Sequence, residues 1–177
     1  MDKKRFNVHK IALLGVLTAG TIVIAILESF IPSIGIPGVK LGLANIMILV
    51  ILYELGIIEA IIVNLTRVLV VGLIRGTFLS MGFVMSLTGA MLSLAVMILF
   101  YLLIKKFSIV GVSVIGSVFH VTGQILVAML YLGTSYVVFY LPIIAISAII
   151  TGVLVGFTAK MIIQTGAIKK QKEKYNF

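Results

Sequence analysis

Long apolar runs, separated by short polar breaks, fill most of the sequence. A helix of about 20 apolar residues crosses the hydrocarbon core of a bilayer. Six runs are candidates for such crossings: 10–30, 41–54, 57–75, 82–104, 108–132 and 136–160. The second run is short, and its boundary with the third depends on a turn at Glu54-Leu-Gly56. The pattern therefore predicts an all-α integral membrane protein with six transmembrane helices.

Polar tails flank this apolar region. We expect an N-terminal tail over 1–9, a transmembrane domain over 10–162 and a basic C-terminal tail over 163–177. The first run is longer than the apolar part of a signal peptide, and no small-residue cleavage site follows it, so we interpret it as a retained helix. Eleven Lys and Arg residues fall in the tails, at the adjoining run ends and in the 105–106 loop, against two, Lys40 and Arg75, on the other side. This asymmetry predicts that both termini are cytoplasmic, in a bacterial cell membrane.

Composition narrows the chemistry. The chain is 62% hydrophobic and 11% charged, with mean hydropathy +1.31. It has no Cys, which removes disulfides and thiolate sites. Its single Asp, Asp2, leaves no paired aspartates for Mg²⁺, and no P-loop, HExxH or GxSxG pattern occurs. We therefore expect no metal, no cofactor, no catalytic residue and no enzyme activity. The basic tails indicate membrane orientation rather than nucleic-acid binding.

One arginine interrupts the third run. Arg67 lies near its middle, where a charged side chain costs about 2.5–3.5 kcal/mol on insertion scales. Asn64, Val71 and Arg75 share its helix face by their spacing. Such groups normally face a bundle interior or a wet cavity rather than lipid. Arg67 is therefore expected to point inward, toward Asn45 and His120.

The topology gathers the strongly polar residues of several runs at mid-depth or in the outer half. We interpret them as substrate-binding candidates around a cavity that opens outward. Because positive charges exceed negative ones, this cavity favours an anionic ligand, and the planar fork of Arg suits phosphate or carboxylate. The candidates are Glu28, Lys40, Asn45, Asn64, Arg67, Arg75, His120 and Gln124.

Structural interpretations of the same residues remain open. Arg67 could be satisfied by helix-end carbonyls or by Glu28, and His120 with Gln124 could hold helices together. Lys40 and Arg75 could be interfacial anchors, as Glu54 and Glu59 could be turn residues at the cytoplasmic side. The protein would then be a scaffold with an internal polar network.

Small residues form a second pattern. The first run carries Ala12, Gly15 and Ala19, and the sixth carries Gly152 and Gly156. Such steps let helix backbones approach closely. They serve packing within the chain or the docking of a partner subunit.

Three stretches resemble a known family: Ile36-Pro-Gly-Val-Lys-Leu-Gly-Leu-Ala-Asn-Ile46, residues 67–80, and residues 113–124 with their His-xxx-Gln. They resemble the Gx transporter family, also labelled heptaprenyl diphosphate synthase component I. That family is similar to the S components of energy-coupling factor (ECF) transporters. The resemblance implies a six-helix protein that binds a vitamin-like molecule from outside. It also implies docking of a transmembrane coupling subunit, itself joined to ATPases, on Ala12, Gly15 and Ala19.

Two functions follow as hypotheses. The first is an S component that captures a small, anionic vitamin-like or prenyl- or quinone-related molecule. The second is a non-catalytic membrane subunit or binder in isoprenoid or quinone (heptaprenyl diphosphate) metabolism or in extracellular electron transfer. Association with an ATPase module separates the two.

Overall fold

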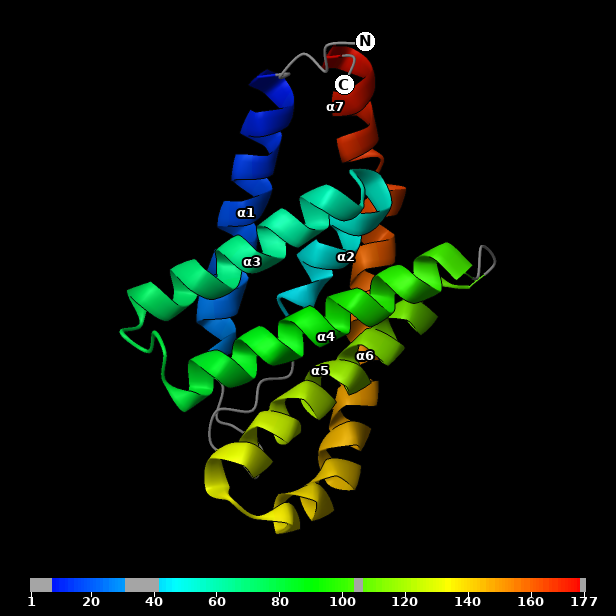
Figure 1. The fold of residues 1–177 in the computed structure, drawn as a ribbon. Helices are drawn as coiled ribbons and strands as arrows, with labels where there is room; N and C mark the ends of the chain where they lie inside the picture. The colour runs from blue at the N-terminus through cyan, green and yellow to red at the C-terminus, as the bar shows by residue number, and fades with distance from the viewer. Residues whose placement is uncertain (1–7, 31–41, 104–106, 176–177) are drawn as a thin grey trace.

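The computed structural model describes residues 8–30, 42–103 and 107–175, and these residues form helices joined by short turns (Figure 1). Lys40, one of the binding candidates, lies outside the described residues. The helices are α1 (Val8–Glu28), α2 (Asn45–Glu54), α3 (Ile57–Ile74), α4 (Met81–Leu103), α5 (Ile109–Leu132), the 3₁₀ helix η1 (Ser135–Tyr140), α6 (Leu141–Gln164) and α7 (Ala167–Tyr175).

Five helical segments of the described chain are long and apolar enough to cross a membrane: α1, α3, α4, α5 and the continuous η1–α6 segment. The second predicted span, 41–54, becomes helical only at Asn45. With 10 residues, α2 is about 15 Å long, about half of the hydrocarbon thickness. It cannot cross the bilayer as a helix by itself.

The short helix α2 is the buried centre of the fold. It packs against α1, α3 and α6, and the side chains from Ile48 to Leu52 are fully buried. A helix that is surrounded by other helices is apolar on every side. This burial explains why α2 has no polar face. Because it begins inside the bundle, its first residue, Asn45, also lies in the interior at 3% exposure.

Glycines let α4, α5 and α6 pack closely. A Cβ on Gly123 of α5 would lie 3.0 Å from the Cα of Gly89 on α4. A Cβ on Gly152 of α6 would lie 2.7 Å from the Cα of Val114 on α5. At these distances only glycine permits the approach. Gly152 therefore serves packing within the chain, the first of the two roles expected of it.

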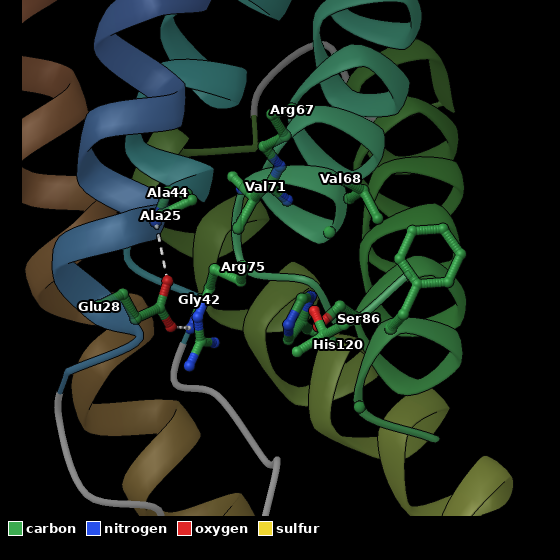
Figure 2. A pocket seen from close by; sticks show the side chains of 14 residues that line it. Ala25, Glu28, Gly42, Ala44, Arg67, Val68, Val71, Arg75, Ser86 and His120 are labelled. Atoms are coloured by element: carbon green, nitrogen blue, oxygen red, sulfur yellow. Dashed lines mark hydrogen bonds between the residues drawn. The ribbon is translucent and has the colours of Figure 1, made fainter. Parts of the chain in front are cut away.

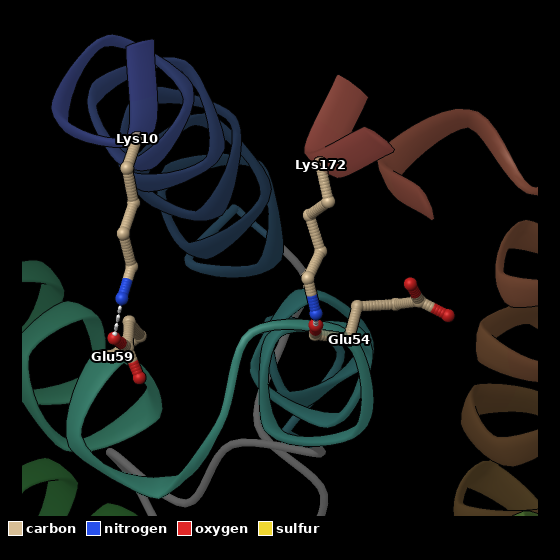
Figure 3. Close-up of polar contacts among 4 residues, drawn as sticks. All are labelled: Lys10, Glu54, Glu59 and Lys172. Carbon is tan, nitrogen blue, oxygen red and sulfur yellow. Dashed lines mark hydrogen bonds and ion pairs between the residues drawn. The ribbon is translucent and has the colours of Figure 1, made fainter. Parts of the chain in front are cut away.

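The first and last residues of the described chain lie at the same end of the helix bundle. Lys10 of α1 forms an ion pair with Glu59 in the first turn of α3 (Figure 3). Lys172 of α7 donates to the backbone carbonyl of Glu54 at 2.6 Å. The rings of His9 and Tyr175 stack with centroids 3.9 Å apart. The predicted basic tail is thus partly a helix that lies against the bundle.

Candidate functional site

A cavity of about 240 Å³ lies between α1, α3, α4 and α5, with the segment 42–44 on one side (Figure 2). It is at the end of the bundle away from the chain ends, because Glu28 is the last residue of α1 and Arg75 follows the last residue of α3. Its apolar wall comes mainly from Val68, Val71 and Phe83. Its polar lining consists of Glu28, Arg67, Arg75, Thr77, Ser86 and His120.

Arg67 provides a buried positive charge in this cavity. Its side chain is 4% exposed, and Nη2 donates to Oδ1 of Asn45 at 2.8 Å. Nε is buried and has no hydrogen-bond partner among the described residues. A guanidinium carries five N–H donors, and an unsatisfied buried donor is costly. The arginine therefore retains donor capacity for a further acceptor in the cavity.

Asn45 fixes the orientation of the Arg67 side chain from outside the cavity lining. It is the first residue of α2, and its Nδ2 lies 3.4 Å from Oγ of Ser93 on α4. The amide thereby connects α3 to α4 through the start of α2. Asn45 does not belong to the cavity lining, so it positions Arg67 without facing the cavity itself.

Glu28 is engaged by backbone rather than by an arginine. Its carboxylate accepts from the backbone N–H of Gly42 and, at 3.4 Å, from that of Ala44 (Figure 2). Within the described part of the chain, no Lys or Arg comes within ion-pair distance of it. Glu28 is one of the alternative partners considered for Arg67, and among the described residues the two side chains form no direct ion pair. The carboxylate satisfies donors that precede α2, where a negative charge is favoured.

Gly42 must be a glycine for this arrangement. Its φ is +85°, in the left-handed region, and a Cβ would lie 3.1 Å from Nδ2 of Asn45. The same Cβ would lie 3.6 Å from Cδ2 of His120. The backbone at residue 42 thus packs between the Arg67-binding amide and the histidine ring.

The remaining candidates divide between the cavity and the packing around it. His120 of α5 lines the cavity, and its Nε2 lies 3.1 Å from Nε2 of Gln124 one turn along the same helix. Gln124 is fully buried and does not line the cavity. Asn64 donates through Nδ2 to the carbonyl of Ala90 at 3.1 Å, which holds α3 to α4. His120 and Gln124 therefore contact each other within α5, and Asn64 connects α3 to α4.

Arg75 is exposed and lies at the mouth of the cavity. It follows Arg67 by eight residues, which is about 12 Å along a helix. The Arg67 side chain is buried and that of Arg75 is exposed, so the two differ in their access to solvent. Sequence reasoning missed Ser86, whose buried Oγ lacks a hydrogen-bond partner among the described residues, as well as Thr77 and Phe83. Small hydroxyls and aromatic rings are common in apolar helices, so the sequence carries no signal that singles them out.

The described lining carries more positively charged than negatively charged side chains. It contains two guanidinium groups and one carboxylate within the described residues. No group of three or more His, Asp or Glu side chains that could hold a metal occurs in the part of the chain that the structure describes.

A family model described as heptaprenyl diphosphate synthase component I matches residues 17–162. The chain belongs to this family. The matched region runs from α1 into α6 and contains every residue of the cavity lining, together with Asn45 and Gln124. The cavity of this protein therefore lies within the region that the family model matches. Comparisons with curated proteins and with solved structures gave no match.

Proposed function

We propose that this protein is the membrane-embedded substrate-binding (S) component of an ECF-type importer. It captures a small anionic molecule from outside, and separate ATPases, joined through a transmembrane coupling subunit, power its release to the inside. The observation that carries the proposal is the buried Arg67 guanidinium, which faces a cavity and retains a donor without a partner.

The proposed topology has six crossings and cytoplasmic termini. The contact between His9 and Tyr175 supports an even number of crossings, because it brings the ends of the described chain to one side. The excess of Lys and Arg in the tails supports a cytoplasmic location for that side. The cavity, at the opposite end, then opens to the outside. In this topology α2 forms part of the second crossing.

The proposed docking face for the coupling subunit lies on α1. Ala12, Gly15 and Ala19 are all exposed, and a Cβ on Gly15 would meet no atom within 4 Å. They occupy one face of the helix by their spacing, which allows close approach of another helix. The resemblance to ECF S components supports this use of the surface.

The cavity volume limits the ligand. About 240 Å³ corresponds to roughly eight water volumes, which is below the usual range for drug-sized ligands. It suits a compact molecule, or the charged head of a longer one. The apolar wall of Val68, Val71 and Phe83 suits an apolar body next to the anionic group.

The family description, heptaprenyl diphosphate synthase component I, supports a second candidate function. The protein would then be a non-catalytic membrane subunit or binder that takes a prenyl diphosphate. Its place would be in isoprenoid or quinone metabolism or in extracellular electron transfer. In that case the cavity would take only the diphosphate and the first carbons of the chain. This candidate predicts that no ATPase module accompanies the protein.

Native mass spectrometry of the full-length protein, purified in mild detergent, tests the binding site. We expect a small anionic molecule to remain bound to wild type and to Lys160→Gln, an exposed change on α6. Arg67→Gln should lose it, while Arg67→Lys should retain it in part because the charge stays but the planar fork is lost. Equal retention by a folded Arg67→Gln variant would contradict the assignment of the site.

Co-purification separates the two functions. The S-component proposal expects ATPase subunits to accompany tagged wild type and to be lost from Gly15→Leu, which adds bulk on the exposed face of α1. Val16→Leu, at a neighbouring exposed position that is already large, is the matched control. Bound prenyl diphosphate without any ATPase would favour the second candidate.

A further inference from the structure

The phenyl ring of Phe83, on α4, forms part of the cavity wall and rests directly on the backbone of α3. Phe83 is 6% exposed. A Cβ on Gly72 of α3 would lie 2.6 Å from Cδ2 and 2.9 Å from Cε2 of the ring. The absence of a side chain at position 72 therefore provides the space in which the edge of the ring lies.

Other described side chains pack around the same ring. The Phe78 ring lies against it with centroids 4.9 Å apart, and Phe83 belongs to a buried apolar cluster with Val68 and Ala90. Because Phe83 is almost completely buried, the open space next to its ring among the described residues is the cavity. A displacement of the ring away from Gly72 would therefore narrow the cavity.

We infer that Phe83 and Gly72 together limit the size of the ligand. Phe83 is a specificity-determining residue, because its ring bounds the space for the apolar part of the ligand. Gly72 is a positioning residue, because it lets the ring lie against α3 rather than further into the cavity. The ligand is then an anion with a narrow apolar body, and broader anions are excluded by their shape. This inference rests on the proposed function, since it concerns the ligand of the same cavity.

The first reason is the tightness of the contact between the ring and α3. Carbon atoms in contact are about 3.5–4.0 Å apart, so a Cβ at 2.6 Å would overlap the ring by roughly 1 Å. Buried side chains are densely packed and yield little to such an overlap. In a cavity of about 240 Å³, a ring shift of this size removes space for a ligand. A smaller side chain at position 83 has the opposite effect, because it leaves the volume of the ring to the ligand.

The second reason is the position of the ring relative to the polar groups of the cavity. Ser86 follows Phe83 by three residues on α4, so the two share a helix face, and both line the cavity. Arg67 lines the same cavity from α3, the helix on which the ring rests. Because the cavity is small, a ligand whose anionic group contacts Arg67 has its remaining atoms near the ring.

Ser86→Cys places a probe next to the ring, and its thiol is the sole one because the chain contains no Cys. Two uncharged reagents of different width, methyl and benzyl methanethiosulfonate, modify this thiol in the full-length protein in nanodiscs. In each case the thiolate forms a disulfide with the reagent and releases methanesulfinate. Mass spectrometry gives both rates, and their ratio cancels any change in the fraction of thiolate.

The ratio of the benzyl rate to the methyl rate is compared among variants that all carry Ser86→Cys. Phe83→Leu should raise the ratio about tenfold, because the broad reagent gains space, and Gly72→Ala should lower it by a similar factor. Adding Phe83→Leu to Gly72→Ala should bring the ratio back toward its starting value. Phe100→Leu, the same change in an aromatic pair with Phe107 outside the cavity lining, is the matched control and should leave the ratio unchanged.

Phe83→Met provides a second replacement of the ring, so the result does not depend on the folding of one variant. An unchanged ratio in the folded Phe83 variants would overturn the inference. So would a Gly72→Ala ratio that the addition of Phe83→Leu does not raise.

A charged pair of reagents tests the proposed function separately. Sulfonatoethyl and trimethylammonioethyl methanethiosulfonate modify the same introduced thiol, and each rate is divided by that for a free thiol in solution. A faster corrected reaction with the sulfonate supports an anion-binding cavity. An equal or slower one contradicts the proposed function and leaves the size limit of the cavity intact. If the methyl reagent does not reach the introduced thiol, the cavity is wrong and both proposals fall with it.

Discussion

Arg67 on α3 and Asn45 at the start of α2 are joined by a hydrogen bond of 2.8 Å from Nη2 to Oδ1, with both side chains less than 5% exposed. The bond places a guanidinium against the first turn of a half-length helix. It leaves Nε of Arg67 without a partner among the described residues. The amide therefore holds the arginine in one orientation while part of its donor fork stays available to the cavity.

Replacing Asn45 should destabilise the protein through Arg67. We expect Asn45→Ala to lower the free energy of unfolding by about 1.5–3 kcal/mol, because a buried charged donor loses its acceptor. Ser93→Ala should cost less than about 1 kcal/mol, since its contact to Asn45 is long at 3.4 Å. Unfolding in mixed detergent micelles measures both. Additive effects in an Arg67→Gln/Asn45→Ala double variant would contradict a direct coupling.

Replacing a glycine at the α5–α6 contact by alanine should destabilise the protein, whereas the same change at Gly15 should not. We expect Gly152→Ala to lose about 1–3 kcal/mol, because the new methyl would lie 2.7 Å from the Cα of Val114. Gly15→Ala meets open space, so it should be neutral or stabilise by up to about 1 kcal/mol through helix propensity. Thermal unfolding in detergent compares them. Equal effects would mean that α6 packs less closely than the structure indicates.

The ion pair between Lys10 and Glu59 should contribute little and depend on salt. Its side chains are 37% and 14% exposed, so solvent screens the interaction. Glu59→Gln is expected to lower stability by at most about 1 kcal/mol at low ionic strength, and by less in high salt. Glu54→Gln is the matched control, because Lys172 contacts the backbone carbonyl of Glu54. If the loss of stability is the same at low and high ionic strength, Glu59 stabilises the protein through contacts other than the ion pair with Lys10.

Labelling of introduced cysteines tests the proposed orientation in the membrane. The chain contains no Cys of its own that would react with the label. Leu79→Cys lies between α3 and α4 at a position that is 70% exposed, and Gln171→Cys lies on the exposed side of α7. A membrane-impermeant maleimide should label the first in intact cells and the second only after the membrane is permeabilised. The reverse pattern would invert the topology and turn the cavity toward the cytoplasm.

The sequence by itself determined the long helices and the polar residues among them. The predicted spans 82–104 and 108–132 correspond closely to α4 (Met81–Leu103) and α5 (Ile109–Leu132). This agreement has a simple cause, since a helix that crosses lipid needs a fixed apolar length and ends where polar residues return. The depth of Arg67 within its apolar run likewise predicted that it would be buried, because lipid gives a guanidinium no partner.

Only the tertiary structure decided which polar groups meet. Glu28 contacts the backbone of Gly42 and Ala44 rather than Arg67, and Ser86 joins the lining although nothing in its run distinguishes it. The short length of α2 was also decided by the tertiary structure, because an apolar run does not show where its helix begins. Such partners are set by how tilted helices cross and by where a glycine allows close approach. Those relationships join residues far apart in the chain, and local periodicity does not encode them.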